Sequence, residues 1–205
     1  MPTTRDVWTV APSPGWSQSG CEPNMILWWP LPYDAEVNVV ELFSDHDGDS
    51  VAFVCDGVSQ TYGQLTSRVE IARTELARLA PAGSNIVIMG ESSLLFIEAL
   101  FAALSAGLPV VPLHPRYPRG EVERAVQLAR PVLIVSTDDA SYVMAQVFSI
   151  EHIRAEELFV ESQGEPIAPL DLEPDHPALL MFTSGTAGSP RIAVLSHGNV
   201  AASIE

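Results

Sequence analysis

A loop rich in glycine and hydroxyl side chains lies near the C-terminal end of the chain, between two apolar runs that are typical of strands. The runs occupy 178–182 and 192–197. Gly185 and Gly188 allow the loop backbone to bend, so successive N–H groups can point at one anion, and Arg191 adds a positive charge. This pattern indicates a phosphate-binding loop, although a polar turn between two strands would have the same composition. The hydroxyl donors of the loop are Thr183, Ser184, Thr186 and Ser189.

The segment before this loop alternates between short apolar runs and amphipathic runs, which predicts strands and helices in turn. Parallel strands joined by helices need right-handed crossovers, so the alternation implies a largely parallel sheet with helices on its faces. The predicted fold class is therefore α/β, with layered helices on a largely parallel sheet. The expected elements here are strands at 85–90, 109–113 and 132–136, and helices at 94–106 and 118–130.

Shorter elements are expected on both sides of this region. Asp56-Gly57 predicts a two-residue hairpin turn, and Thr61 with Gln64 predicts a capping box at the start of a helix. The apolar residues that follow at helical spacing give this helix one buried face. The other expected elements are a helix at 37–43, a strand at 50–55, a short helix and a strand within 142–158, an acidic surface connection at 161–177, and a helix that Ser196 caps.

Two further groups of chemically capable residues are interpreted as structural. His114 lies in a loop between a strand end and Pro115, where a histidine is more often structural than catalytic. Asp171, Glu173 and Asp175 have the spacing of an acidic run, and we expect them to be solvated charges rather than metal ligands. The sequence therefore predicts no metal-ligating side chains.

Composition limits the possible partners. The chain has 205 residues, 47% of them hydrophobic, which suits one large domain or part of a bigger one. Its net charge of −16 argues against nucleic acid or an anionic membrane surface as a partner. ATP is not excluded, because a local ring of donors decides binding when distant charges are screened. All 10 basic residues are Arg, so a Walker-type loop with its Lys is excluded.

Cysteine usage and the apolar segments predict a cytoplasmic protein without a membrane span. Cys21 and Cys55 lack metal-ligand spacing, and two unpaired thiols favour a reducing compartment. The N-terminus does not show the pattern of a signal peptide. The long apolar stretch at 94–113 is interrupted by Glu98 and Gly107, which favours a buried helix followed by a strand.

The segment 182–199 resembles the phosphate-binding motif of the AMP-forming adenylating enzymes, which reads (Y/F)TSGTTGxPKGVxxSHxN. These enzymes are the acyl-CoA synthetases, the adenylation domains of nonribosomal peptide synthetases, and the luciferases. Here the motif reads FTSGTAGSPRIAVLSHGN. The departures are Ala187 for Thr, Arg191 for Lys and Ile192 for Gly. A match of this length is specific for the family.

Two other segments resemble family motifs in the same order. Residues 61–65 resemble TYxEL, and residues 102–118 resemble LKAGxxYVPLDPxxP. The resemblance implies an incomplete N-terminal domain of the adenylating-enzyme fold over 37–205, ending within the helix after the phosphate loop. Residues 1–36 are a separate arm rich in Pro and Trp. We expect this arm to pack irregularly on the domain, and a docking segment is the alternative.

The resemblance also implies a reaction. An ATP-dependent ligase of this family activates a fatty, aryl or amino acid as an acyl-adenylate, releases pyrophosphate, and usually transfers the acyl group to a thiol of CoA or carrier-protein pantetheine. Mg²⁺ accompanies the phosphates. The resemblance places the β and γ phosphates on Thr183, Ser184, Gly185, Thr186, Gly188 and Arg191.

In the family, a catalytic Lys and most of the acid pocket lie in later segments, which the chain of 205 residues is expected to lack. The chain contains no Lys that could replace it. By itself it is therefore expected not to catalyse adenylation, and no catalytic residue is assigned. The alternative hypothesis is a non-catalytic, truncated homologue that binds a partner through an open sheet edge.

Overall fold

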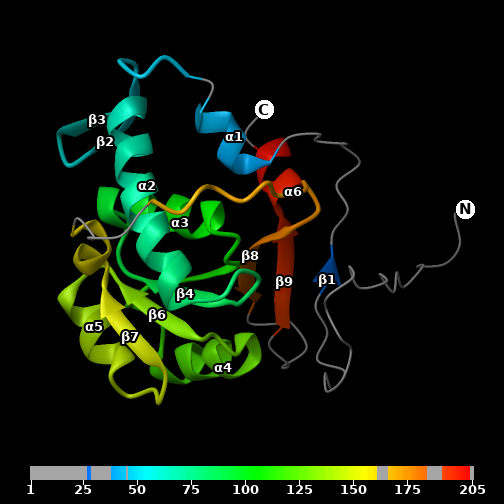
Figure 1. Cartoon of the computed structure of the whole chain (residues 1–205). Helices are drawn as coiled ribbons and strands as arrows, with labels where there is room; N and C mark the ends of the chain where they lie inside the picture. The colour runs from blue at the N-terminus through cyan, green and yellow to red at the C-terminus, as the bar shows by residue number, and fades with distance from the viewer. Residues whose placement is uncertain (1–26, 29–37, 45, 161–165, 184–190, 204–205) are drawn as a thin grey trace, which may run out of the picture.

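The computed structural model describes residues 27–28, 38–44, 46–160, 166–183 and 191–203. Its centre is a seven-stranded sheet with the strand order β1-β9-β8-β5-β4-β6-β7 (Figure 1). All neighbouring strands are parallel except β8 and β9, so the predicted largely parallel sheet is confirmed. The strands are β1 (Leu27–Trp28), β4 (Ile86–Met89), β5 (Val110–Leu113), β6 (Leu133–Ser136), β7 (Glu151–Arg154), β8 (Pro177–Thr183) and β9 (Arg191–Ser196).

Helices cover both faces of this sheet, which explains why β4 and β5 are apolar throughout and β6 is apolar up to Ser136. In β4, Ile86 and Ile88 face the cluster that holds α2 (Tyr62–Leu79) and α3 (Leu94–Ser105). Val87 and Met89 face the cluster that holds α4 (Arg119–Ala129) and α5 (Asp139–Ala145). Successive side chains of a strand point to opposite faces, so a strand buried on both sides is nearly all apolar.

A small hairpin precedes this layered body, as the sequence predicts. Strands β2 (Val51–Cys55) and β3 (Val58–Thr61) pair antiparallel. Asp56 and Gly57 join them with φ values of 50° and 78°, the conformation that a two-residue turn requires. Thr61 then caps α2 in a reciprocal box with Gln64. The short helix α1 (Val39–Ser44) comes before the hairpin, and Cys55 is a free thiol.

Helix α3 follows β4 and is apolar except for Glu98 and its last residue, Ser105. Ser93 caps its first turn through the backbone N–H of Phe96. The small residues of α3 are buried, whereas its large apolar residues toward the N-terminal end are only partly buried. The partly buried set is Leu94, Leu95, Phe96, Ile97, Leu100 and Phe101.

The connection into β8 crosses the surface beside α2 and α3, as Figure 1 shows in orange. We call residues 166–176 the strap. Arg73 of α2 donates from Nη2 to the Ile167 carbonyl at 3.0 Å, and Asn38 donates from Nδ2 to the Leu172 carbonyl at 3.3 Å. The strap side chains are mostly exposed, except the buried Leu172, so the predicted surface connection is confirmed over these residues. The rest of that segment, 161–165, lies outside the described residues.

The two edges of the sheet differ. At one edge, Leu27 and Trp28 pair in parallel with Ala193 and Val194 of β9. These two residues are the described part of the predicted arm, and the rest of 1–36, with Cys21, lies outside the described residues. At the other edge, β7 carries the charged residues Glu151 and Arg154, which is typical of a protected edge strand. Among the described residues, no helix is long and apolar enough to cross a membrane.

Candidate phosphate site

Strands β8 and β9 form an antiparallel hairpin, and the predicted phosphate loop is its tip. The last pair of this ladder joins Thr183 to Arg191. Paired Cα atoms in an antiparallel ladder lie about 4.5–5.5 Å apart, so the structure brings these two candidates together. The other four candidates, Ser184, Gly185, Thr186 and Gly188, belong to the connection 184–190, which lies outside the described residues. We call β8, this connection and β9 the phosphate hairpin.

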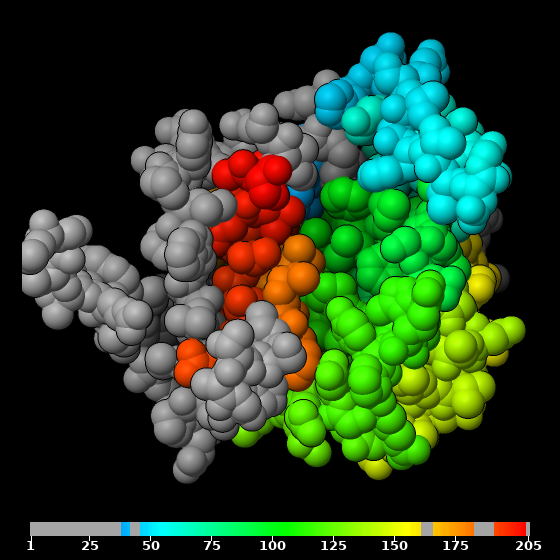
Figure 2. Space-filling view, turned by 180° about the vertical axis from the view of Figure 1, so that it is seen from behind, coloured from blue at the N-terminus to red at the C-terminus, as the bar shows by residue number. Residues whose placement is uncertain are grey.

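The alternation of buried and less buried residues along β9 shows which side chains of the hairpin face the core. Ile192 and Val194 are buried with Leu180 in the cluster beneath α4, whereas Arg191 is exposed. The period of two therefore puts the guanidinium of Arg191 on the opposite side from the core contacts of Ile192. Figure 2 shows the β8 and β9 segments, in orange and red, beside the green segment that contains α3 and α4.

The described end of the hairpin, where Thr183 pairs with Arg191, lies at the edge of the sheet where ligands usually bind. Because β8 runs parallel to β5, Thr183 ends at the same edge as the carboxyl ends of β4, β5 and β6. In open α/β sheets, ligands bind outside the carboxyl ends of the strands. His114 follows β5 at this edge, and its Nδ1 accepts the backbone N–H of Arg116 at 3.1 Å. That contact fits the structural role expected for His114.

The acidic residues of the strap point to water. Asp171, Glu173 and Asp175 are all exposed. Within the described ranges, no group of three or more His, Cys, Asp or Glu side chains is placed to hold a metal ion. The exposure of Asp171, Glu173 and Asp175 agrees with the interpretation of the acidic run as solvated charge.

The base of the phosphate hairpin holds a pair of histidines that sequence reasoning missed. Pro177 pairs with Ser196, and the next residue outward on each side is His176 or His197. The backbone N–H of His197 donates to the His176 carbonyl at 2.9 Å, and the two ring centroids are 5.9 Å apart. His197 opens helix α6 (His197–Ala202), which Ser196 caps together with Asn199 as expected.

The buried ring of His197 has an altered acidity. His197 is fully buried. Burial, with a smaller contribution from the charge of His176, lowers the pKa of His197 to about 4. The ring is therefore neutral at pH 7. In the sequence, the signal for this site is the Ser196-His197 pair at the start of the helix that Ser196 caps.

The sequence of the chain is similar to a protein-family model and to several known proteins. The family model described as AMP-binding enzyme matches residues 41–205. The tenellin synthetase of Beauveria bassiana is 30% identical over 172 residues, which cover 78% of this chain and 4% of that protein. A feruloyl-CoA synthase from an Amycolatopsis species is 31% identical over 147 residues, which cover 70% of this chain and 30% of that protein. The chain thus spans a small part of these curated relatives.

Solved structures agree on the fold. VinN in complex with L-aspartate superposes with a TM-score of 0.73 at 20% identity, covering 82% of this chain and 47% of that one. O-succinylbenzoate coenzyme A synthetase (MenE) from Bacillus subtilis, in complex with AMP, gives 0.67 at 18% identity, covering 76% and 41%. The matched family model covers most of the chain, the three motifs occur in family order, and the fold agrees. The chain therefore belongs to the AMP-binding enzyme family.

Proposed function

We propose that the domain over 37–205 supplies the pyrophosphate end of the nucleotide site in an ATP-dependent ligase. The ligase would activate a carboxylic acid as an acyl-adenylate and pass the acyl group to a thiol of CoA or of carrier-protein pantetheine. Membership of the AMP-binding enzyme family supports this proposal. The observation that carries it is the pairing of Thr183 with Arg191 at the carboxyl edge of the sheet, where a loop rich in N–H and hydroxyl donors begins and ends.

The chemistry explains why such a loop is needed. A carboxylate oxygen of the acid attacks the α-phosphorus of ATP, and the bond from that phosphorus to the bridging oxygen breaks. Pyrophosphate leaves with the electron pair, so negative charge grows on the β-phosphate. Preorganised donors stabilise such charge without reorganisation of water. In this proposal the donors are the backbone and hydroxyl groups of Thr183, Ser184, Gly185, Thr186 and Gly188, with the Arg191 guanidinium.

Mg²⁺ fits this donor set as an ion carried by the phosphates. The candidate residues are hydroxyl, amide and guanidinium groups, none of which is a carboxylate that would hold the ion by itself. Bound Mg²⁺ would neutralise phosphate charge, while Arg191 and the loop hold the phosphate oxygens. The chain has no Lys, so the proposal assigns no Lys-dependent step to it.

The departures from the family motif are compatible with this role. Ile192 stands where the motif has Gly, but its side chain is buried beneath α4 and contributes to the core. It therefore faces away from the exposed side of Arg191. Arg191 keeps the positive charge of the motif Lys and offers a planar fork that can hold two phosphate oxygens.

Replacing Arg191 with Ala tests the proposal. Loss of a charge-assisted hydrogen bond costs roughly 1.5–3 kcal/mol, so the Kd for Mg·ATP is expected to rise about tenfold or more. The measurement is isothermal titration at fixed salt, with circular dichroism to check the fold. Arg191 is exposed, so the free energy of unfolding is expected to stay nearly constant.

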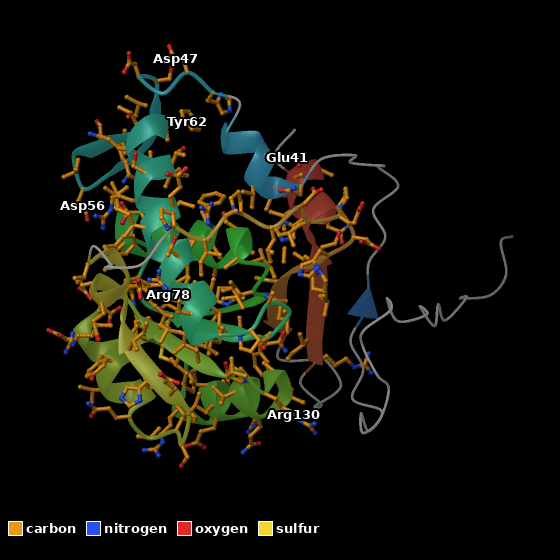
Figure 3. All side chains as sticks on the ribbon, viewed as in Figure 1. Glu41, Asp47, Asp56, Tyr62, Arg78 and Arg130 are labelled. Carbon is orange, nitrogen blue, oxygen red and sulfur yellow. The ribbon has the colours of Figure 1, made fainter. Side chains whose placement is uncertain are left out.

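Arg78→Ala is the matched control for this titration. Arg78 is on α2, away from β9 (Figure 3), where it pairs with Glu75. Its loss removes the same charge from the net balance without touching the phosphate hairpin. Equal weakening by both variants would mean that Arg191 acts only through overall charge, and unchanged affinity in Arg191→Ala would remove Arg191 from the site.

The alternative of a partner-binding module gains no support from the sheet edges. At one edge, the two-residue strand β1 pairs with β9, and at the other edge, β7 carries charged residues. We therefore retain the ligase as the proposed function.

A further inference from the structure

The histidine pair at the base of the phosphate hairpin is a titratable cluster that the proposed function does not use. Two backbone hydrogen bonds join the strap to the first turn of α6 there. His197 donates to the His176 carbonyl at 2.9 Å, and Gly198 donates to the Pro174 carbonyl at 2.7 Å. These bonds continue the β8–β9 ladder beyond the pair at its base, Pro177 with Ser196. The base of the hairpin is therefore closed by the strap.

The ring of His197 lies inside this closure without polar partners. It is fully buried, and neither Nδ1 nor Nε2 has a hydrogen-bond partner in the part of the chain that the structure describes. A protonated imidazole carries two N–H donors and a charge, and a buried charge without a partner is costly. The first turn of a helix adds to this cost, because its N–H dipoles disfavour a cation.

Among the described residues, no carboxylate compensates a charge on this ring. Helix α6 packs against α1, β8 and β9, and β8 contributes no ionisable side chain. Of the groups in the described ranges, His176 alone acts on the pKa of His197 through its charge, and it lowers that pKa further. The ionisable groups on the other elements around α6 are Glu41 on α1, Arg191 at the far end of β9, and Asp171, Glu173, Asp175 and His176 on the strap.

We propose that His176 and His197 form an acid-sensitive latch, in which the strap stays on α6 while the His197 ring is neutral, and protonation of His197 opens the base of the phosphate hairpin. The hairpin then frays from the end opposite the phosphate loop. This device goes beyond the proposed function and does not depend on nucleotide binding.

The direction of the pH effect follows from linkage. The pKa of His197 is about 4 when the latch is closed, and an exposed histidine has a pKa of about 6.5. Protons therefore bind more tightly to the open latch. The free energy that holds the latch closed is at its full value above about pH 6.5. It falls as the pH drops toward 4 and changes little below that. Between pH 7.5 and 5.5, the opening constant is expected to rise about tenfold.

Amide hydrogen exchange of the whole 205-residue chain tests the latch. The N–H groups of His197 and Gly198 report its opening directly, because both donate to strap carbonyls. After correction for the intrinsic pH dependence of exchange, both amides should exchange about tenfold faster at pH 5.5 than at pH 7.5. Amides of the β2–β3 hairpin, a separate two-stranded sheet whose local opening leaves His197 buried, should change much less. Equal corrected rates at the two pH values would overturn the proposal.

Two variants assign the effect to its residue. His197→Phe keeps a buried ring and removes the titration, so the pH dependence of the Gly198 amide should disappear. His152→Phe removes a histidine of β7 that contacts Tyr142, far along the sheet, and should leave the dependence intact. If His197→Phe fails to fold, the NMR titration of the His197 ring in the natural chain replaces it. A His197 that titrates near pH 6.5 would overturn the proposal as surely as an unchanged pH dependence in His197→Phe.

Discussion

Replacing Arg68 with Met is expected to lower the free energy of unfolding by about 2–3 kcal/mol, because it leaves the carboxylate of Glu98 buried without its cation. Glu98 is only 3% exposed and lies among the apolar residues of α3. Arg68 donates from Nε to Glu98 Oε1 at 2.5 Å, and its guanidinium lies 4.0 Å from the ring centroid of Phe159. The Arg68 side chain is 41% exposed and partly screened by water, so the expected loss in free energy of unfolding is smaller than for a fully buried pair.

A second substitution separates the buried charge from other effects of the change. Gln60 donates from Nε2 to the same Glu98 Oε1 at 2.5 Å, so Glu98→Gln keeps an acceptor for Gln60 while removing the charge. Adding Glu98→Gln to Arg68→Met should therefore restore about 2 kcal/mol, measured by urea unfolding at pH 7. Arg78→Met on the same helix, in a partly exposed pair with Glu75, should cost less than about 1 kcal/mol. If Glu98→Gln destabilises the Arg68→Met chain further, the buried charge is not the cause.

Replacing Gly90 with Ala is expected to destabilise the chain by about 2 kcal/mol through overpacking. A Cβ atom on Gly90 would lie 1.7 Å from Thr137 Oγ1 and 3.0 Å from Thr137 Cβ. Rotation of the hydroxyl relieves the first contact but not the second. Neither backbone can move freely, because Gly90 donates to the Leu113 carbonyl at 3.0 Å and Thr137 donates to the Met89 carbonyl at 2.9 Å.

Gly120→Ala is the matched control for this change. Gly120 lies in α4, and a Cβ atom there would meet nothing within 4 Å. Because Ala is a better helix former than Gly, this variant should be neutral or more stable by up to about 1 kcal/mol. In thermal unfolding, Gly90→Ala should lower Tm by about 4–8 °C. Similar Tm values for the two variants would contradict the packing around Thr137.

The sequence predicted the fold where local signals and burial agree. The turn at Asp56-Gly57 and the caps at Thr61 and Ser196 are local, so each could be read from a few residues and each is present. The central strands carry continuous apolar runs, because helices cover both faces of the sheet. At these positions, the local sequence signals and the burial in the folded chain favour the same secondary structure.

Other features depend on contacts between distant residues. Helix α3 is apolar nearly all round, which predicts a place between layers, but its large residues near Leu95 are only partly buried. The pairing of β1 with β9 joins residues more than 160 positions apart and has no periodic signal. The contact of His176 with His197 follows from hairpin register, which the two strand patterns do not specify.

For the candidate site, residue types were predictable and geometry was not. The motif identifies the six candidates, and the structure places Thr183 and Arg191 opposite each other at the end of the ladder. The remaining four candidates stay predictions from the sequence. Burial of Ile192 shows why a bulky residue is tolerated where the motif has Gly, which the sequence alone could not show because strand facing depends on register.

The phosphate hairpin is proposed to bind the pyrophosphate portion of a nucleotide. The most direct measurement is an NMR titration of the ¹⁵N-labelled chain with magnesium pyrophosphate, following every assigned backbone amide. The largest shifts are expected at the amides of 184–191, with small shifts along β8 and β9, and Arg191→Ala should weaken the binding about tenfold or more. A lack of shifts at 184–191 at high magnesium pyrophosphate concentration, or shifts centred on another part of the sheet edge, would contradict binding at the phosphate hairpin.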